Sequence, residues 1–153
     1  MRVLLINNFH YNRGGAEKCY FDTGKILEKN GHKVAYFATN HPKTIPSKWQ
    51  KYFVSYYELE AKQSFRAKIK VIARFFYNRE AKLKIKQLIE DFKPDIAHVH
   101  NIHHHLSPSI LKELKRQNVS VVMTLHDYKL ISPNYNLFTR GEIWEKSKPK
   151  KYY

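Results

Sequence analysis

The segment between residues 7 and 17 most constrains the fold of this chain, because it joins an apolar run to an amphipathic helix through two adjacent glycines. The apolar run, residues 3–6, is continuous instead of alternating, which is typical of a parallel strand covered on both faces. Apolar residues at helical spacing occupy residues 16–30, and Gly31 supplies a stop signal after them. Together with an apolar strand at 34–38, this segment predicts a βαβ unit.

The same alternation of strands and helices continues along the chain. A strand is predicted at 96–100, a Ser-Pro pair starts a predicted helix at 107–117, and residues 120–125 form a fourth predicted strand. Residues 63–92 have a helical and strongly basic pattern, with Asn78 as a break. We therefore expect an α/β fold with a parallel sheet and helices on both faces.

Length and composition predict one domain over residues 1–140, followed by a truncated basic tail at 141–153. The formal charge of +15 favours an anionic partner, such as nucleic acid, a phosphorylated ligand or an acidic membrane surface. Cys19 is the only cysteine, which excludes an intrachain disulfide and a zinc site built from cysteines, and we expect it in the core. The N-terminal apolar run is too short for a signal peptide or a membrane span, so a cytoplasmic location is expected.

Polar residues follow the predicted strands, at the edge where ligands of parallel sheets gather. Gly14 and Gly15 open the first helix, whose unpaired N–H groups favour an anion such as phosphate; alternatively, the glycines serve only the geometry of the turn. Residues 101–105 and the pair His126-Asp127 follow two later strands. No Ser or Cys nucleophile stands in an elbow motif there, which argues against a hydrolase.

Five histidines between residues 98 and 105 raise the alternative of a metal site. His98 and His100 are two apart on a strand and so share a face, and neutral imidazoles ligate zinc or nickel. No carboxylate follows at a suitable spacing, and the three consecutive histidines at 103–105 cannot all converge on one ion. We therefore expect histidines that form hydrogen bonds in a pocket, and no metal.

Two further segments each allow two interpretations. The aromatic segment at 39–62, for which we predict one short strand, either packs against the core or forms a ligand-binding flap. The charge of the basic segment at 63–92 belongs either to a solvated outer face or to a surface that binds an anionic membrane. Its predicted apolar stripe includes Phe65, Ile69, Ile72, Phe76, Leu83, Leu88 and Ile89.

Three motifs occur in order along the chain. They are Asn-Asn-Phe-His-Tyr-Asn-Arg-Gly-Gly-Ala-Glu-Lys at 7–18, His98-Val99-His100-Asn101 with Leu106-Ser107-Pro108-Ser109, and Thr124-Leu125-His126-Asp127-Tyr128-Lys129-Leu130. Together they resemble the N-terminal half of the family 4 retaining glycosyltransferases, over essentially the whole chain. The resemblance implies a Rossmann-like domain that forms the N-terminal half of a GT-B fold, with the active site in the cleft to a second domain.

The resemblance also implies roles for particular residues. Gly14 and Gly15 approach the diphosphate of a nucleotide-sugar donor, and His126 is the catalytic residue, which contacts the donor sugar near its reacting face. No metal or other cofactor is expected, because basic residues and helix N-termini stabilise the leaving diphosphate. The candidate acceptor-binding residues are Tyr11, Asn101, His103 and Asp127.

The implied function is that of the acceptor-binding domain of a glycosyltransferase in cell-surface polysaccharide or glycolipid synthesis. Its expected partners are a nucleotide sugar, a glycan or lipid-linked acceptor, the C-terminal GT-B domain that these residues lack, and the inner face of the cell membrane as a peripheral site. The chain alone is expected to be inactive. The resemblance also implies a Cys pair after the Pro-Asn-Tyr segment, where this chain has Trp144 and Ser147 instead. The alternative, motivated by the charge, is a basic α/β module that binds nucleic acid, which the motifs make the weaker hypothesis.

Overall fold

The computed structural model describes residues 1–58, 74–130, 132 and 134–144. Its centre is a five-stranded sheet with the order β3-β2-β1-β4-β5, in which all neighbouring strands are parallel. The strands of this sheet are β1 (Arg2–Phe9), β2 (Lys33–Asn40), β3 (Val54–Ser55), β4 (Ile96–Val99) and β5 (Ser120–Met123). The short strand predicted in the aromatic segment is therefore present, as β3.

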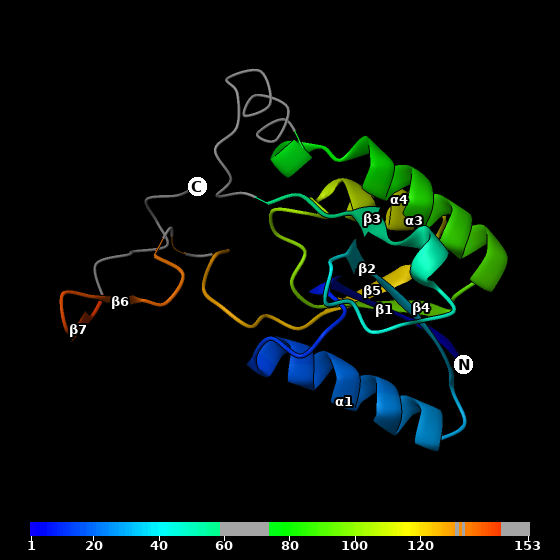
Figure 1. Cartoon of the computed structure of the whole chain (residues 1–153), viewed down its shortest axis with the longest axis horizontal. Helices are drawn as coiled ribbons and strands as arrows, with labels where there is room; N and C mark the ends of the chain where they lie inside the picture. The colour runs from blue at the N-terminus through cyan, green and yellow to red at the C-terminus, as the bar shows by residue number, and fades with distance from the viewer. Residues whose placement is uncertain (59–73, 131, 133, 145–153) are drawn as a thin grey trace.

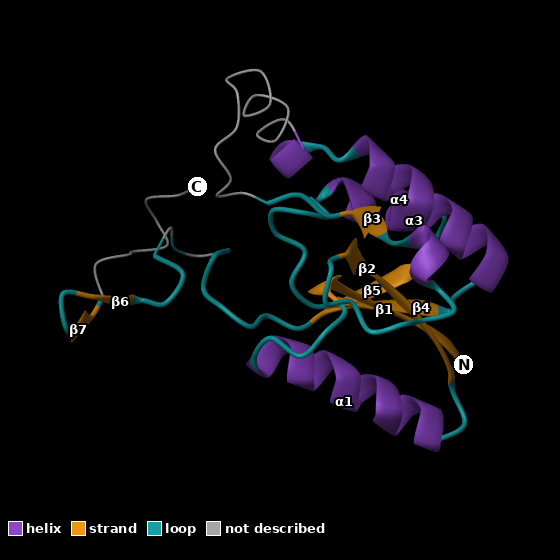
Figure 2. Ribbon diagram, in the orientation of Figure 1, coloured by secondary structure: helices purple, strands orange, loops and turns teal. Residues whose placement is uncertain are grey.

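Helices cover both faces of this sheet (Figure 1). Helix α1 (Gly15–Lys29) lies on one face, and α3 (Arg79–Phe92) and α4 (Ser109–Arg116) lie together on the other (Figure 2). A short 3₁₀ helix, η1 (Gln50–Tyr52), precedes β3. The predicted α/β architecture, Rossmann-like with a parallel sheet between helices, is confirmed.

Strand β1 is buried along nearly its whole length, which explains why its apolar residues run without interruption. Its register places Leu5 between Tyr36 of β2 and His98 of β4. Successive side chains point to opposite faces, so Leu4 joins the core under α3 and α4 while Leu5 joins a smaller cluster under α1. The same alternation stacks the rings of His98 and His100, with their centroids 4.4 Å apart.

Three predicted core positions are wrong. Cys19 is exposed, because the side of α1 that faces the sheet carries Tyr20 and Gly24 instead. Leu83 is 62% exposed, since α3 turns a different side toward the sheet, and Phe76, which precedes α3, is 78% exposed. The buried residues of α3 are Ala81, Ile85, Leu88, Ile89 and Phe92. The remaining stripe residues Phe65, Ile69 and Ile72 lie outside the described residues.

Two predicted boundaries also shift. Strand β5 ends at Met123, two residues early, and Leu125 beyond it is 58% exposed. Helix α4 begins at Ser109 because Ser107 has a left-handed backbone, with φ of 63°, which is not helical. The Ser107 hydroxyl still accepts a hydrogen bond from the N–H of Ser109 (3.3 Å), so the predicted capping role is kept from just before the helix.

Residues 134–144 contain a hairpin that the sequence pattern did not predict. Strand β6 (Phe138–Thr139) pairs antiparallel with β7 (Glu142–Ile143), and Gly141 between them has φ of 83°, a conformation that favours glycine. The hairpin lies across the expected boundary between residues 140 and 141, and residues 145–153 lie outside the described part of the chain. Among the described residues, no helix has the length and apolar character needed to cross a membrane.

Candidate functional site

Helix α1 begins at Gly15, the second residue of the glycine pair that follows β1, and Gly14 is its N-cap. The N–H of Lys18 donates to the carbonyl of Gly14 (3.0 Å), and the N–H groups before it have no partner within the helix. Neither glycine has a left-handed backbone, and a Cβ atom at Gly15 would meet no atom within 4 Å. The turn therefore does not require glycine at position 15. Because Gly15 has no side chain, the space in front of the positive end of the helix is open.

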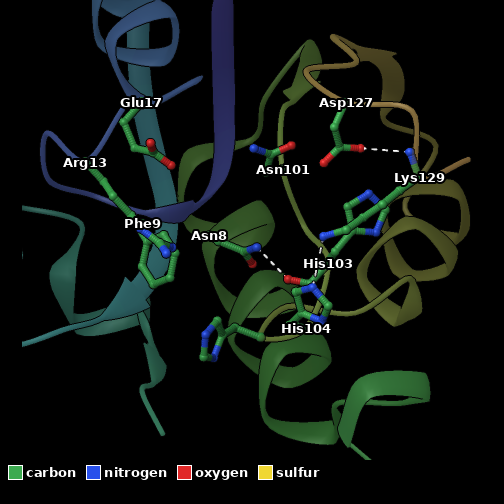
Figure 3. Close-up of a pocket in the computed structure, with 10 residues that line it drawn as sticks. Asn8, Phe9, Arg13, Glu17, Asn101, His103, His104, Asp127 and Lys129 are labelled. Carbon is green, nitrogen blue, oxygen red and sulfur yellow. Dashed lines mark hydrogen bonds between the residues drawn. The ribbon is translucent and has the colours of Figure 1, made fainter. Parts of the chain in front are cut away.

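A pocket of about 220 Å³ lies beside this helix end (Figure 3). Asn8 and Asn101, from the ends of β1 and β4, lie in its middle. Arg13 and Glu17 come from the start of α1, and Lys129 comes from the segment after β5. The lining consists of Asn8, Phe9, Arg13, Glu17, Asn101, His103, His104, His105, Asp127 and Lys129. Two cations, two carboxylates and two amides in one pocket match the hydroxyl groups of a sugar, which both donate and accept hydrogen bonds.

The asparagines hold the ends of β1 and β4 together. The N–H of Asn8 donates to the carbonyl of Asn101 (2.7 Å), and the N–H of Asn101 donates to the side-chain oxygen of Asn7 (3.2 Å). The side-chain amide of Asn8 donates to the carbonyl of His103. The Asn8 Oδ1 atom is buried and has no hydrogen-bond partner among the described residues, so a ligand can donate to it.

The three consecutive histidines at 103–105 all line the pocket. Burial lowers the pKa of His103 and His104, and the nearby Lys129 ammonium lowers both further. Burial also lowers the pKa of His105 to about 4. The Lys129 ammonium donates to Nε2 of His104 (3.0 Å), which requires a lone pair on that nitrogen. At neutral pH the loop therefore presents uncharged imidazoles that form hydrogen bonds.

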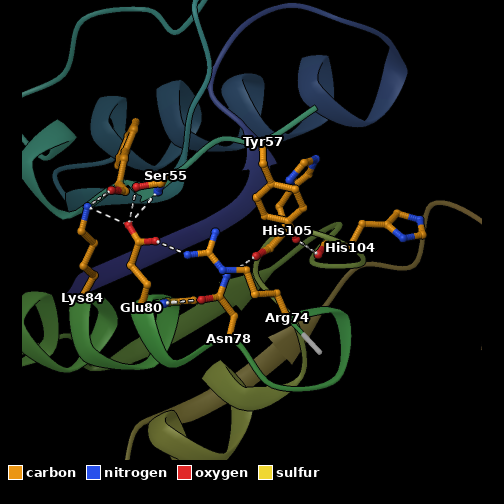
Figure 4. Close-up of polar contacts among 10 residues, drawn as sticks. Ser55, Tyr57, Arg74, Asn78, Glu80, Lys84, His104 and His105 are labelled. Atoms are coloured by element: carbon orange, nitrogen blue, oxygen red, sulfur yellow. Dashed lines mark hydrogen bonds and ion pairs between the residues drawn. The ribbon is translucent and has the colours of Figure 1, made fainter. Parts of the chain in front are cut away.

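Hydrogen bonds from other elements fix this histidine loop (Figure 4). Asn78, which is fully buried, caps α3 by accepting from a backbone N–H three residues later (3.1 Å). Its side-chain amide donates to the carbonyl of His105 (2.6 Å). The Tyr57 hydroxyl donates to the carbonyl of His104 (2.7 Å). The predicted helix break at Asn78 is thus a helix cap that also positions the loop.

Glu80 links α3 to β3 within the same region (Figure 4). Its carboxylate accepts hydrogen bonds from the N–H and the hydroxyl of Ser55, both at 2.8 Å, and lies 3.4 Å from the Lys84 ammonium and 3.7 Å from Arg74. Burial raises the pKa of Glu80, but the hydrogen bonds from Ser55 and the charge of Lys84 lower it by more, so the pKa lies below its ordinary value. The carboxylate therefore stays ionised and holds β3 against the start of α3.

The aromatic segment at 39–62 divides between the two interpretations. Trp49 packs against the cluster under α3 and α4, so that part of the segment belongs to the core. Tyr56 lies beside the pocket, with its ring 6.4 Å from that of the pocket residue Phe9 and 4.5 Å from that of His41. Tyr11 stacks on His41 with a centroid distance of 4.6 Å. Tyr11 thus lies next to the pocket without being part of its lining.

His126 follows β5 and pairs with His100, the residue directly after β4. Its Nε2 atom lies 2.9 Å from Nδ1 of His100, and the two rings are nearly parallel. Asp127 turns away from this pair, since its carboxylate accepts from the N–H of Lys129 (3.0 Å). Asp127 lines both the 220 Å³ pocket and a neighbouring hollow of about 360 Å³, which His126 also lines. His126 and the pocket are therefore adjacent.

The structure brings most of the predicted site residues to one edge of the sheet. Asn101, His103 and Asp127 share the pocket, and His126 lies in the adjoining hollow. The expected pocket histidines His104 and His105 are in the lining as well. The pocket residues that the sequence did not single out are Asn8, Phe9, Arg13, Glu17 and Lys129. These residues lie inside the family motifs, near the predicted site residues. Their position in the motifs is the sequence signal that could have identified them. The nearness of Cys19 to His126 had no such signal, because it depends on the order of the strands.

A family model described as Glycosyltransferase Family 4 matches residues 13–151. The chain belongs to glycosyltransferase family 4. This family 4 chain is also similar to a Klebsiella pneumoniae protein described as an uncharacterized 42.6 kDa protein in the cps region, with 28% identity over 152 residues and 92% of this chain covered. The chain spans 40% of the length of that relative. Arg13, the glycine pair and His126 all lie within the part that matches the family 4 model.

Proposed function

We propose that this family 4 chain is the N-terminal, acceptor-side domain of a retaining, sugar-nucleotide-dependent glycosyltransferase with the GT-B fold, acting in cell-surface polysaccharide or glycolipid synthesis. The observation that carries the proposal is the open space at Gly15 in front of the α1 N-terminus. Family membership and the similarity to a protein of a cps region support it.

The donor diphosphate binds at Gly14 and Gly15, where the unpaired N–H groups of the first helical turn point at it. Arg13, whose guanidinium lies 4.8 Å from the centre of the Phe9 ring, adds a positive charge beside them. His126 contacts the donor sugar near its reacting face. Transfer proceeds without a metal, because the helix end and the basic side chains stabilise the charge that develops on the leaving diphosphate.

The acceptor binds in the 220 Å³ pocket, where Asn101, His103 and Asp127 contact its hydroxyl groups and Tyr11 extends the site. The carboxylate of Asp127 accepts hydrogen bonds from hydroxyls, and neutral His103 can accept or donate one. The buried, unpartnered Oδ1 of Asn8 needs a donor, which a sugar hydroxyl supplies. The hydrogen-bond acceptors of the pocket thus match the hydroxyl groups of a sugar, which supports a glycan or a glycan-bearing lipid as acceptor.

A second domain outside these 153 residues completes the site by binding the nucleotide. Transfer requires donor and acceptor to be held in line, and a helix end that faces water holds a diphosphate only weakly. We therefore expect chain 1–153 to transfer no sugar from a panel of radiolabelled nucleotide sugars, and transfer to appear when a separately expressed C-terminal domain is added. Sustained turnover by the chain alone would contradict the proposal.

A lipid-linked acceptor would bring the enzyme to the anionic inner face of the membrane. Phe76 and Tyr77, just before α3, and Leu83 within it are exposed, and Arg79 and Lys82 are near them in sequence. Exposed apolar and basic side chains together favour such a surface, and each basic residue near it contributes about 1 kcal/mol. The chain should sediment with anionic vesicles; equal recovery with neutral vesicles would remove the membrane from the proposal.

The glycines of α1 provide a matched test of the diphosphate site, in the protein that includes the second domain. We expect Gly15→Val to abolish transfer while the free energy of unfolding changes by only about 0.5 kcal/mol, since the new side chain meets no protein atom. Gly24→Val is the control. A Cβ atom there would lie 2.2 Å from the Tyr36 hydroxyl and 3.2 Å from Leu5, so this variant should lose roughly 1–3 kcal/mol of stability. Normal turnover of stable Gly15→Val would refute the phosphate role.

A further inference from the structure

We propose that Cys19, His100 and His126 form a binding site for one Zn²⁺ ion. One ligand atom from each residue lies within 4.8 Å of those of the other two. The three residues come from α1, the end of β4 and the segment after β5, and only the fold brings them together. Among the described residues, no other group of three such side chains has its ligand atoms this close together.

The types of these three residues fit zinc. Thiolate sulfur and neutral imidazole nitrogen are its usual ligands in proteins, at about 2.0–2.3 Å. In a tetrahedral site with such bonds, neighbouring ligand atoms are roughly 3.3–3.8 Å apart. The two histidine nitrogens are 2.9 Å apart and the whole group spans up to 4.8 Å, so small side-chain rotations bring all three atoms to the required spacing.

The histidine pair is arranged as two ligands would be. His100 is fully buried, and its Nδ1 faces Nε2 of His126, so one proton at most is shared between them. The other ring nitrogen of His100, Nε2, is buried and has no hydrogen-bond partner among the described residues. His98 stacks on His100 but lies outside the group, because its Nε2 pairs with the Thr124 hydroxyl at 2.7 Å. A Zn²⁺ ion takes the place of the shared proton, which moves to the other nitrogen of the same ring, so that each ring stays neutral and binds the ion through a lone pair.

Cys19 makes this site accessible and gives it a soft ligand. Its side of α1 is exposed, so an ion can enter from solvent, and the thiol proton passes to solvent as the sulfur binds the ion. Three protein ligands leave a fourth position for water, as in open zinc sites. The loop histidines at 103–105 do not compete, because the Lys129 ammonium already occupies Nε2 of His104 and repels a second cation.

Binding of the ion takes up the His126 nitrogen that the proposed donor contact would use. Zn²⁺ and the donor sugar therefore exclude each other at His126, and metal binding can be tested without any activity assay. A binding experiment on chain 1–153, without an affinity tag, needs only the metal.

The experiment titrates the chain with Co²⁺, whose bond to a thiolate gives a charge-transfer absorption, and then displaces Co²⁺ with Zn²⁺. We expect about one Co²⁺ per chain, the thiolate absorption, and full displacement by Zn²⁺. Cys19→Ser should abolish the absorption and weaken Zn²⁺ binding by roughly tenfold or more, without loss of fold because the side chain is exposed. His126→Gln should weaken binding without changing the far-ultraviolet circular dichroism.

Two controls separate this site from adventitious binding. His32→Ala removes the imidazole that lies 3.3 Å from the N-terminal amine, and His104→Ala removes a histidine of the loop; neither should change the absorption or the affinity. The proposal fails if Co²⁺ binds without a thiolate absorption. It also fails if folded Cys19→Ser binds Zn²⁺ as tightly as the parent chain, or if His32→Ala alone removes binding.

Discussion

The two faces of the sheet are packed with different kinds of side chain. Under α3 and α4 lies a large aliphatic cluster in which Leu4, Ile85 and Leu88 are fully buried. Under α1 the buried cluster is small and consists of Val3, Leu5, Tyr20 and Val34. Polar rings such as His10 and His100 fill much of the remaining contact with α1.

Because of this difference, one face of the sheet supplies most of the stability, and the other carries the residues of the proposed sites. Apolar burial is the main favourable term in folding, so most of the stabilisation comes from the α3 and α4 face. The α1 face can hold polar rings because they find partners; Nδ1 of His10, for example, lies 3.0 Å from the Tyr20 hydroxyl. Gly15, Cys19 and His126, on which both proposals rest, all lie on or beside this less apolar face.

The largest expected effect is a loss of stability, measured for one substitution on each face of the sheet. Ile85→Ala should lower the free energy of unfolding by about 2–5 kcal/mol, because it opens a cavity in a fully buried cluster. Leu27→Ala on α1 should cost clearly less, since Leu27 is only partly buried against the smaller cluster. Urea unfolding of both variants measures the difference. Equal losses would show that α1 contributes as much stability as α3.

The second effect concerns chemistry on the α1 side. In the protein with its second domain, His126→Ala should lower turnover by about one to three decades, the scale of losing one polar contact at the transition state. His32→Ala is the matched control and should leave turnover unchanged, because His32 lies at the opposite end of α1. Steady-state kinetics decide the outcome. Unchanged turnover of His126→Ala would reduce His126 to a structural partner of His100.

The smallest effect is a pH dependence that comes from the polar rings. Burial lowers the pKa of His10, of His100 and of the loop residue His105 from 6.5 to about 4 in the folded chain. The unfolded chain therefore binds more protons between these values, so stability is complete above pH 6.5 and falls as the pH drops toward 4. Thermal melts should show the midpoint falling by several degrees over this range.

A variant sharpens this last comparison. His10→Phe removes one titrating ring and should flatten the pH dependence, whereas Ile85→Ala should lower the midpoint equally at all pH values. If His10→Phe keeps the full slope between pH 6.5 and 4, His10 is not a source of the pH dependence.

The sequence predicts the fold well where the pattern of apolar residues follows directly from how a strand or helix is buried. The continuous apolar run of β1, the helix ending before Gly31 and the strand β4 all follow from local periodicity and stop signals. It failed at Cys19 and Leu83, since a helix position at apolar spacing is buried only if the packing angle of the helix turns it to the sheet. That angle depends on close contacts such as Gly24 against Tyr36, which no local pattern contains.

For the candidate site, the sequence identified the edge of the sheet but not the neighbours within it. Asn101, His103 and Asp127 follow predicted strands, and parallel strands end at one edge of a sheet, so their common location is predictable from the sequence. The pairing of His100 with His126 requires that β4 and β5 be adjacent and in register, which is a property of the strand order. Family motifs point to residues in the site, whereas contacts between motifs need the structure.

Strand β5 has a practical consequence for work with this chain. It is the last strand of the sheet, Val121 and Val122 are 40% and 50% exposed, and the described residues place no further strand beside it. An open apolar edge is a template on which a second molecule can add its own strand. The charge of +15 keeps molecules apart at low ionic strength, but salt screens it. Purification in high-salt buffer should therefore promote self-association of chain 1–153, and light scattering against ionic strength belongs before any binding measurement.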